Sequence, residues 1–205
     1  MLANDKITEY LDKAAAGTAV PGGGSVAALN AALAAGLTEM VANLTIGKKK
    51  YAAVEAEMTA LVEKASQLRE KLTAAIDRDA DAYTEVMAAY RLPKSTDEEL
   101  ALRKQKIQDA IKHAALVPME VARQALAVID LASQAILKGN KNAASDGAVA
   151  AMNARTAALA AIYNVRINLG SIDDQGFVEK LEQEVNELQN RVIAKEKEAL
   201  SHVNV

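Results

Sequence analysis

The chain has no cysteine and no tryptophan, and only one phenylalanine and three prolines, in 205 residues. The absence of cysteine excludes a disulfide framework, a thiolate metal site and a cysteine nucleophile. The only histidines, His113 and His202, lie far apart in the sequence. We therefore expect no metal centre, because a histidine-based zinc site and a serine–histidine–aspartate triad both need histidines in the right place.

Strong charge and membrane-spanning length are also missing. The net charge is −3, and no long basic run or aromatic–basic interleaving occurs, which argues against nucleic acid as a partner. The stretch Val26–Val41 is apolar but contains Asn30, Thr38 and Glu39, and it is shorter than the roughly 20 apolar residues of a membrane span. The beginning of the chain does not have the form of a signal peptide. We expect a cytoplasmic protein that binds no membrane.

Good helix formers dominate the composition, helical spacing of apolar residues recurs, and strand-type alternation is rare. The length suits one domain, and neither a linker nor an internal repeat is evident. We predict a single-domain all-α bundle over residues 1–205, with about seven helices, two of them long. The expected helices run from Asn4 or Asp5 to Gly17, Ser25 to Gly47, Val54 to Arg91, Thr96 to Pro118, Met119 to Lys138, Asn142–Asp146 to Gly170, and from Ser171–Asp174 onward.

Three of these expectations depend on particular residues. In the first helix, Ile7, Leu11 and Ala14 share one face. Pro118 is expected to end a helix, since proline has no N–H to donate. The Val26–Val41 stretch is rich in alanine, which suits a central helix packed closely on all sides.

Gly22, Gly23, Gly24 and Ser25 follow Pro21 and precede that alanine-rich helix. Ser25 is well placed to cap the helix. A glycine-rich turn at a helix N-terminus can bind an anion, because the free N–H groups and the helix dipole point the same way. The alternative is a flexible connector followed by a capped helix.

Asp79 is a candidate acid or base. The apolar stripe of the third expected helix contains Leu68, Leu72, Ile76, Tyr83, Val86 and Tyr90, and Asp79 falls in its gap. At about 100° per residue, Asp77 and Asp81 point roughly 160° away from Asp79. Burial on an apolar face raises the proton affinity of a carboxylate. The alternative is a structural aspartate that accepts hydrogen bonds from a neighbouring helix.

Three asparagines and a lysine run are further candidates. Asn140 lies in a polar helix junction, where capping explains only part of the pattern. Asn164 and Asn168 are four residues apart and share a helix face in an apolar segment, so they bind either neighbouring helices or a ligand. The run that starts at Lys48 is either a solvated helix end or an anion-attracting surface.

Taken together, these segments resemble one family, the formiminotetrahydrofolate cyclodeaminase / methenyltetrahydrofolate cyclohydrolase family. The resemblance runs in order from Pro21 to about Leu188. The residues that carry it are Pro21–Ala28, Leu44–Tyr51, Asp77–Tyr83, Arg91–Lys94, Gly139–Asn140, Ser145–Asp146 and Asn164–Leu169. The chain would lack the formiminotransferase domains that precede the cyclodeaminase in the bifunctional animal enzyme.

The resemblance implies an all-helical homodimer that acts on tetrahydrofolate carrying a one-carbon group, with no permanently bound cofactor. The first activity expected is that of the cyclodeaminase, which closes N5-formimino-tetrahydrofolate to 5,10-methenyl-tetrahydrofolate and releases ammonia. The alternative within the family is the cyclohydrolase, which opens the methenyl ring with water to give 10-formyl-tetrahydrofolate. A third possibility, from another class, is a non-catalytic helical interaction protein.

The same resemblance assigns the role of catalytic acid or base to Asp79. We expect Gly22 to Gly24 and Ser25 to contact the folate carboxylate or the pterin edge. We expect Asn140, Asn164 and Asn168 to hydrogen-bond the pterin ring, and Lys48 to Lys50 to attract the glutamate tail, including that of a polyglutamylated folate.

Overall fold

A computed structural model describes residues 1–203, which form six α-helices and three short 3₁₀-helices without any strand. The prediction of an all-α protein is thereby confirmed, and the 36-residue helix α3 matches the long helix expected from Val54 to Arg91. The longest helix, α4, has 42 residues and joins two expected helices. The α-helices are α1 (Ile7–Ala15), α2 (Gly23–Asn43), α3 (Glu55–Tyr90), α4 (Asp97–Lys138), α5 (Ala144–Leu169) and α6 (Gln175–Ser201). The 3₁₀-helices are η1 (Leu2–Asn4), η2 (Lys49–Val54) and η3 (Lys141–Ala143).

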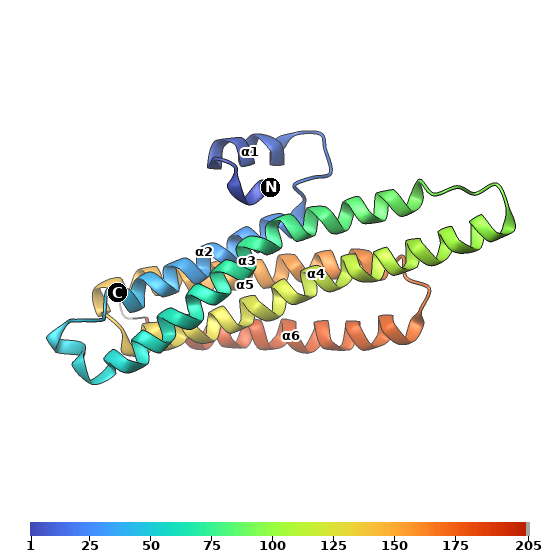
Figure 1. Cartoon of the computed structure of the whole chain (residues 1–205). Coiled ribbons are helices and arrows are strands. Elements are labelled where there is room, and N and C mark those ends of the chain that lie inside the picture. Colours follow the sequence, from blue (N-terminus) through green and yellow to red (C-terminus); the bar gives the residue numbers. More distant parts are fainter. Residues whose placement is uncertain (204–205) are drawn as a thin grey trace.

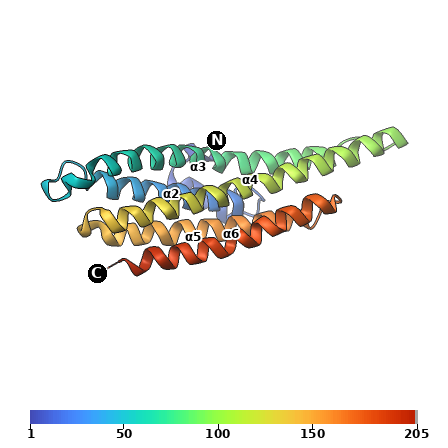
Figure 2. The same ribbon diagram turned by 90° about the horizontal axis from the view of Figure 1, so that it is seen from below.

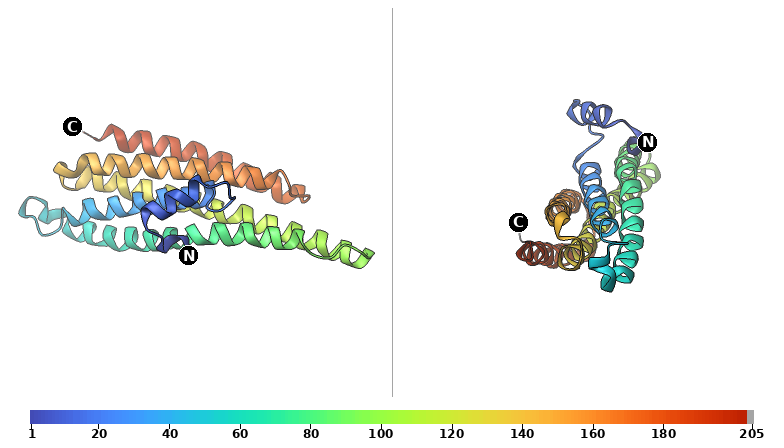
Figure 3. Two further views of the ribbon diagram at one scale, coloured as in Figure 1. Left: turned by 90° about the horizontal axis from the view of Figure 1, so that it is seen from above. Right: turned by 90° about the vertical axis from the view of Figure 1, so that its left-hand side faces the viewer.

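Helices α2 to α6 lie side by side in one elongated bundle (Figures 1 and 2). Helix α2 packs against α3 and α5, and α4 packs against α3, α5 and α6. The α3–α4 hairpin extends beyond the other helices at the end where α2 begins. Helix α1 stands apart from the bundle on the side of α2 and α3 (Figures 1 and 3).

Alanine is the main residue of the contact between α2 and its neighbours, because small side chains let helix axes approach closely. Fully buried alanines on α2 and α5 include Ala27, Ala28, Ala31, Ala34, Ala35, Ala154, Ala157, Ala158 and Ala161. By length and composition α2 could cross a membrane, but 56% of its most apolar window is buried inside the bundle. One face of α2 is nevertheless uncovered, with Leu33 53% exposed. The expectation that this helix packs on all sides is therefore wrong for the single chain.

Pro118 does not end a helix, contrary to the prediction, and lies inside the continuous helix α4. A proline at this position cannot donate to the carbonyl four residues earlier, that of Ala114. The side-chain amide of Asn168 on α5 takes over this role and donates to the Ala114 oxygen at 3.1 Å. A neighbouring helix thus satisfies the carbonyl that Pro118 leaves free, and two expected helices become one.

Two predicted faces are not covered by the chain itself. Tyr83 and Tyr90, expected on the inner stripe of α3, are 41% and 44% exposed. Helix α2 begins opposite Asp79 and runs back along α3 toward Arg69, so that no α2 residue reaches the two tyrosines further along α3. On α1, Ile7 and Leu11 are 80% and 59% exposed, and the buried residue of that helix is Tyr10.

Candidate active site

The N-terminus of α2 meets the middle of α3. Helix α2 begins at Gly23 with Gly22 as an N-cap that has no side chain, so the prediction that Ser25 caps this helix is wrong. Ser25 is fully buried in the first turn. Its hydroxyl donates to the Ile76 carbonyl oxygen at 2.8 Å and lies 3.3 Å from Asp79 Oδ2. Ser25 therefore connects α2 to α3 instead of capping its own helix.

Glycine is required where α2 approaches Asp79. A Cβ atom on Gly24 would lie 1.9 Å from Asp79 Oδ1, and one on Gly23 would lie 3.1 Å from Asn164 Nδ2. The carboxylate of Asp79 thus occupies the space directly over the first turn of α2. The position at which the sequence predicts a bound anion holds a carboxylate of the protein itself, favourably placed for the free N–H groups of the helix.

Burial raises the pKa of the Asp79 carboxyl above its usual value, and this effect outweighs the hydroxyl and backbone amide of Ser25, which lower it. The Ser25 hydroxyl has one proton, and its shorter bond goes to Ile76. When Asp79 is protonated, it can therefore donate to the Ser25 oxygen. A raised pKa makes the carboxylate a better base, while its acid form can still return the proton.

The other two aspartates of this helix point elsewhere, as the helical-face argument predicts. Asp81 is exposed to solvent. The carboxylate of Asp77 accepts hydrogen bonds from the backbone N–H groups of Leu2 and Ala3. Asp77 thus attaches η1 to α3, and Asp79 alone faces the start of α2.

Asn164 lies beside the site, whereas Asn168 lies one helical turn further along α5. The amide nitrogen of Asn164 donates to the Ala160 carbonyl at 2.9 Å, and its Oδ1 accepts no hydrogen bond from residues 1–203. Both N–H groups of Asn168 are used, since its Nδ2 donates to Ala114 and to the Asn164 carbonyl, at 3.1 and 2.8 Å. Asn164 therefore has an acceptor available for a ligand, and Asn168 mainly joins α5 to α4.

Asn140 and Lys48 lie at the opposite end of α2, about 30 Å from Gly24 at 1.5 Å of rise per residue. Asn140 is only 8% exposed. Its backbone N–H donates to Thr45 Oγ1 at 2.8 Å, and its Nδ2 donates to the Leu44 carbonyl at 3.0 Å. Lys48 is exposed at the start of η2. Within one chain these two residues do not join Asp79.

Tyr10 is a buried residue whose burial the sequence does not reveal. It is 7% exposed, and burial raises the pKa of its phenol, with a further contribution from the negative charges of Asp79 and Asp77. Its only signal in the sequence is its spacing of three residues from Ile7, and Ile7 itself is exposed. The position of Tyr10 depends on how α1 packs, which the local pattern does not specify.

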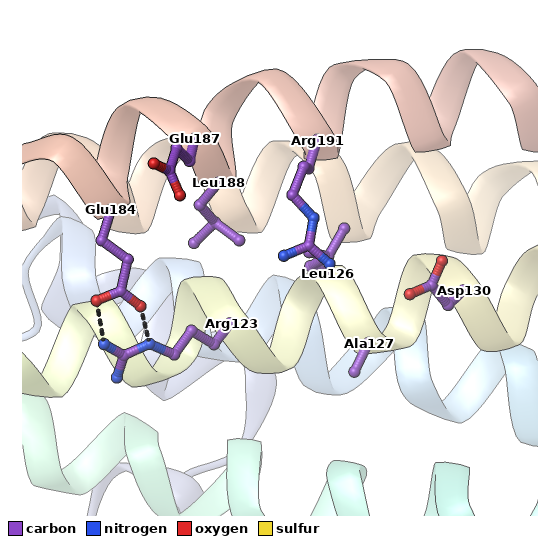
Figure 4. Close-up of a pocket in the computed structure, with 8 residues that line it drawn as sticks. All are labelled: Arg123, Leu126, Ala127, Asp130, Glu184, Glu187, Leu188 and Arg191. Atoms are coloured by element: carbon purple, nitrogen blue, oxygen red, sulfur yellow. Dashed lines mark hydrogen bonds and ion pairs between the residues drawn. The ribbon is translucent and has the colours of Figure 1, made fainter.

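A pocket of about 320 Å³ lies away from Asp79, between α4 and α6 (Figure 4). Its polar residues are Arg123, Asp130, Glu184, Glu187 and Arg191. Arg123 donates to both carboxylate oxygens of Glu184, at 2.6 and 2.8 Å. Because its charges are of both signs and its strongest pair is already formed, this pocket has the character of an interhelical ion-pair surface.

No group of three or more histidine or acidic side chains within residues 1–203 is arranged to hold a metal ion. His113 lies on the α3–α4 hairpin, where its Nδ1 is 2.9 Å from a Glu85 oxygen. The site at Asp79 thus consists of a partly buried carboxyl, a serine hydroxyl, a close glycine turn and an asparagine. A helical protein with such a site belongs to the class of proteins that are suited to acid–base chemistry.

The family is established by comparison with known proteins. Residues 6–187 match the model of the formiminotransferase-cyclodeaminase family, and the chain belongs to this family. It is 45% identical over 188 residues to a methenyltetrahydrofolate cyclohydrolase of Methylorubrum extorquens, a match that covers 92% of this chain and 90% of that protein.

More distant relatives have the other activity in their names. The chain is 32% identical over 187 residues to the formimidoyltransferase-cyclodeaminase of Rattus norvegicus, and this match covers 91% of the chain but 35% of the rat protein. Its structure matches that of a formiminotetrahydrofolate cyclodeaminase from Thermotoga maritima with a TM-score of 0.89 and 32% identity, over 99% of this chain and 98% of that one. The chain thus spans about a third of the length of the rat relative and nearly all of the bacterial ones.

Proposed function

We propose that this protein is a methenyltetrahydrofolate cyclohydrolase, which hydrolyses 5,10-methenyl-tetrahydrofolate to 10-formyl-tetrahydrofolate. The observation that carries the proposal is the 45% identity, over about nine-tenths of both chains, to a protein with that name. The relatives named for cyclodeaminase activity are more distant, at 32% identity. The comparison therefore reverses the order of the two activities expected from the sequence.

Asp79 supplies the proton transfers that this reaction needs. As a base, its carboxylate takes a proton from water while the water oxygen attacks the carbon between N5 and N10. The resulting adduct is neutral and carries a hydroxyl group on that carbon. As an acid, Asp79 then returns the proton to N5, the bond from carbon to N5 breaks, and the hydroxyl proton leaves to solvent as the formyl group forms on N10. A positioned acid–base group typically contributes about 10²–10⁴-fold.

The start of α2 is the proposed place for the reacting end of the folate. Gly23 and Gly24 bring the backbone close to Asp79 and Asn164, and the substrate must lie near this junction to exchange protons with Asp79. The free Oδ1 of Asn164 can accept a hydrogen bond from a pterin N–H group. Orientation of the two reactants can lower the activation free energy by up to about 7–11 kcal/mol.

The cyclodeaminase activity is the second candidate, and the structural match to the Thermotoga maritima enzyme favours it. In this reaction N10 of the substrate is the nucleophile, and Asp79 as an acid protonates the departing nitrogen so that ammonia leaves. Both reactions use one positioned carboxyl group. They differ in whether water reaches the reacting carbon.

We further propose that a second copy of the chain covers the outer face of α1, α2 and α5. This face presents large apolar side chains that the chain itself leaves exposed. They are Ile7, Leu11, Val26, Leu33, Met40, Leu44, Val149, Met152, Tyr163 and Ile167. Two-fold pairing through the middle of this face would bring the Lys48 end of one chain toward the Asp79 end of the other. Sedimentation at micromolar concentration should then give about twice the mass of the 21.7 kDa chain, and an active monomer would contradict the pairing.

Two assays with purified protein decide between the reactions. The first follows the loss of the methenyl absorbance band from 5,10-methenyl-tetrahydrofolate, corrected for spontaneous hydrolysis. The second follows the gain of that band and the release of ammonia from N5-formimino-tetrahydrofolate. We expect the first substrate to be preferred. A preference for the second would replace the proposal by the cyclodeaminase, and no activity on either would favour the interaction protein.

A further inference from the structure

The hydroxyl of Ser25 lies between two acceptors and has one proton to donate. Its oxygen is 2.8 Å from the Ile76 carbonyl oxygen and 3.3 Å from Asp79 Oδ2. Ser25 is 0% exposed, so its hydroxyl chooses between these two groups of the protein. A serine hydroxyl rotates about its C–O bond and donates in one direction at a time. The shorter distance fits a proton directed at Ile76.

The Ile76 carbonyl does not depend on Ser25 for a partner. Ile76 lies inside the continuous helix α3, where its carbonyl also accepts from the backbone N–H four residues later, that of Ala80. Asp79 Oδ2, in contrast, has the Ser25 hydroxyl as its one side-chain partner among residues 1–203. The Ser25 proton can therefore turn away from Ile76 without leaving a buried polar group unpaired.

The charge of Asp79 decides which acceptor is the stronger one. A hydrogen bond to an ionised group is roughly twice as strong as one between neutral groups. An ionised Asp79 is thus a better acceptor for the Ser25 proton than the Ile76 carbonyl. A protonated Asp79 has lost this advantage, because its charge is gone. The direction of the Ser25 proton should therefore follow the charge of Asp79.

We propose that Ser25 is a positioning residue whose hydroxyl donates to Asp79 Oδ2 when Asp79 is ionised and to the Ile76 carbonyl when Asp79 is protonated. This inference rests on the proposed cyclohydrolase function, in which Asp79 takes a proton from water and returns it to N5. Ser25 keeps its own proton in both steps and forms no covalent bond. Because Ser25 holds Oδ2 of the carboxylate, Oδ1 is the oxygen that exchanges the proton with the reactants. The hydroxyl needs only a rotation to serve both charge states.

The ionisable groups on the elements around Asp79 do not take the place of Ser25. They are Asp77 and Arg78 on α3, Tyr10 on α1, Glu120 on α4 and Arg166 on α5, and the first turn of α2 has none. Asp77 accepts from the backbone of η1, and Arg78 pairs with Glu120. Arg166 bonds to three residues of α6. The Tyr10 hydroxyl bonds to no group within residues 1–203, and the other ionisable side chains of α1 are exposed.

The test compares Ser25→Ala with Thr38→Val, which removes another fully buried hydroxyl of α2, one that donates to the Ala34 carbonyl. Without Ser25 the ionised carboxylate loses a donor. On the acid side of the pH profile, where Asp79 is mostly protonated, we expect Ser25→Ala to lower kcat/KM for 5,10-methenyl-tetrahydrofolate by about tenfold, which moves this limb up by about one pH unit. Thr38→Val should leave the limb in place.

Two other results would overturn the proposal. A merely structural role of Ser25 would lower the thermal midpoint or the plateau of kcat/KM and leave the acid limb where it is. A hydroxyl that donates to Ile76 at every pH would present only its oxygen to Asp79 and would favour the protonated carboxyl. Its removal would then move the limb to lower pH.

A second measurement does not depend on activity. With aspartate labelled with ¹³C at the side-chain carboxyl, the NMR signal of Asp79 is assigned from the Asp79→Asn variant and titrated in the protein without substrate. Its midpoint should be higher in Ser25→Ala than in wild type and unchanged in Thr38→Val. If Ser25→Ala does not fold, Ser25→Cys, which keeps a weaker donor, should shift the midpoint in the same direction by a smaller amount.

The two measurements separate this inference from the proposed function. If the wild type releases ammonia from the formimino substrate, or acts on neither substrate, the proposed function fails, and the NMR titration still decides for or against Ser25. A midpoint that is unchanged or lower in the Ser25 variant would overturn the proposal whatever the activity.

Discussion

Polar residues gather at both ends of α2. The two ends differ in how many of the hydrogen-bonding groups of these residues have a partner. At the C-terminal end, Asn140 uses its backbone N–H, its side-chain amide and its Oδ1 in bonds to Thr45, Leu44 and Asn142. At the N-terminal end, the pKa of Asp79 is raised, and the hydroxyl of Tyr10 has no hydrogen-bond partner among residues 1–203. The hydrogen bonds of the first end are formed within the protein, and the second end has unused hydrogen-bonding capacity at the place proposed for the substrate.

This difference also separates two uses of asparagine on α5. Asn168 donates both of its N–H groups to protein carbonyls, one of which Pro118 has left free. Asn164, one turn away, keeps its Oδ1 free beside Gly23. Identical side chains on one face of one helix therefore differ in how many of their hydrogen-bonding groups the protein uses, because only Asn168 lies opposite a carbonyl that a proline leaves free.

The largest effect should come from Asp79→Asn. The amide keeps the shape of the side chain but cannot accept and return a proton, so we expect kcat to fall by about 10²–10⁴-fold. The thermal midpoint should not fall, because the substitution removes a charge whose burial is unfavourable. Asp77→Asn and Asp81→Asn are the controls for activity, and comparable losses of kcat in all three variants would contradict the assignment of Asp79.

Gly24→Ala should lower activity because it displaces the Asp79 carboxylate. The new Cβ would lie 1.9 Å from Asp79 Oδ1, so the Asp79 side chain must move. A displacement of about 1 Å can cost about 10²-fold in rate, and we expect a fall in kcat of that order. Gly17→Ala, where a Cβ would meet no atom within 4 Å, is the matched control. Full activity of Gly24→Ala would mean that the position of Asp79 over α2 is not needed.

Asn140→Ala tests the satisfied end of α2. It leaves the Leu44 carbonyl without its side-chain donor and the Asn142 N–H without its acceptor. We expect the free energy of unfolding to fall by about 1–3 kcal/mol, measured by denaturant titration. The kcat of the folded protein should be unchanged, and Asn142→Ala, an exposed neighbour, should be neutral. A selective loss of kcat with normal stability would place Asn140 in the active site after all.

The pH dependence should reflect the raised pKa of Asp79. As a base, Asp79 acts when it is ionised, so kcat/KM should fall as the pH drops through a pKa above the ordinary aspartate value of 3.8. The free energy of unfolding changes with pH in the opposite direction to kcat/KM. The favourable contribution of protonated Asp79 is complete below the unfolded pKa and is lost as the pH rises through the folded pKa. The stability advantage of Asp79→Asn over wild type should therefore be larger at pH 7 than at pH 4, and an equal advantage at both would contradict the shift.

Lys48→Ala should have the smallest effect. Lys48 is exposed at the start of η2, so we expect the free energy of unfolding to change by less than about 0.5 kcal/mol. If Lys48 attracts the folate tail from a partner subunit, KM should rise for polyglutamylated substrate and stay constant for the monoglutamate. If the ratio of KM for the polyglutamylated substrate to KM for the monoglutamate is the same in Lys48→Ala and in wild type, Lys48 does not bind the folate tail.

The sequence by itself determined the helical class, the long helix α3 and the inward direction of Asp79, because these depend on spacing within a few turns of one helix. The helix start at Asp174 is likewise local, since its carboxylate accepts from the N–H of Phe177 three residues later. The same holds for Thr96, which accepts from the N–H of Glu99.

Only the tertiary structure decided where distant residues meet. Ser25 bonds to Ile76 across 51 positions, and Asn168 bonds to Ala114 across 54. Because of these pairings, Ser25 does not cap α2 and α4 continues through Pro118, contrary to both predictions. Periodicity says which face of a helix is apolar, but not which neighbour covers it. Tyr10 is buried and Ile7 exposed because the packing of α1 is set by contacts outside α1.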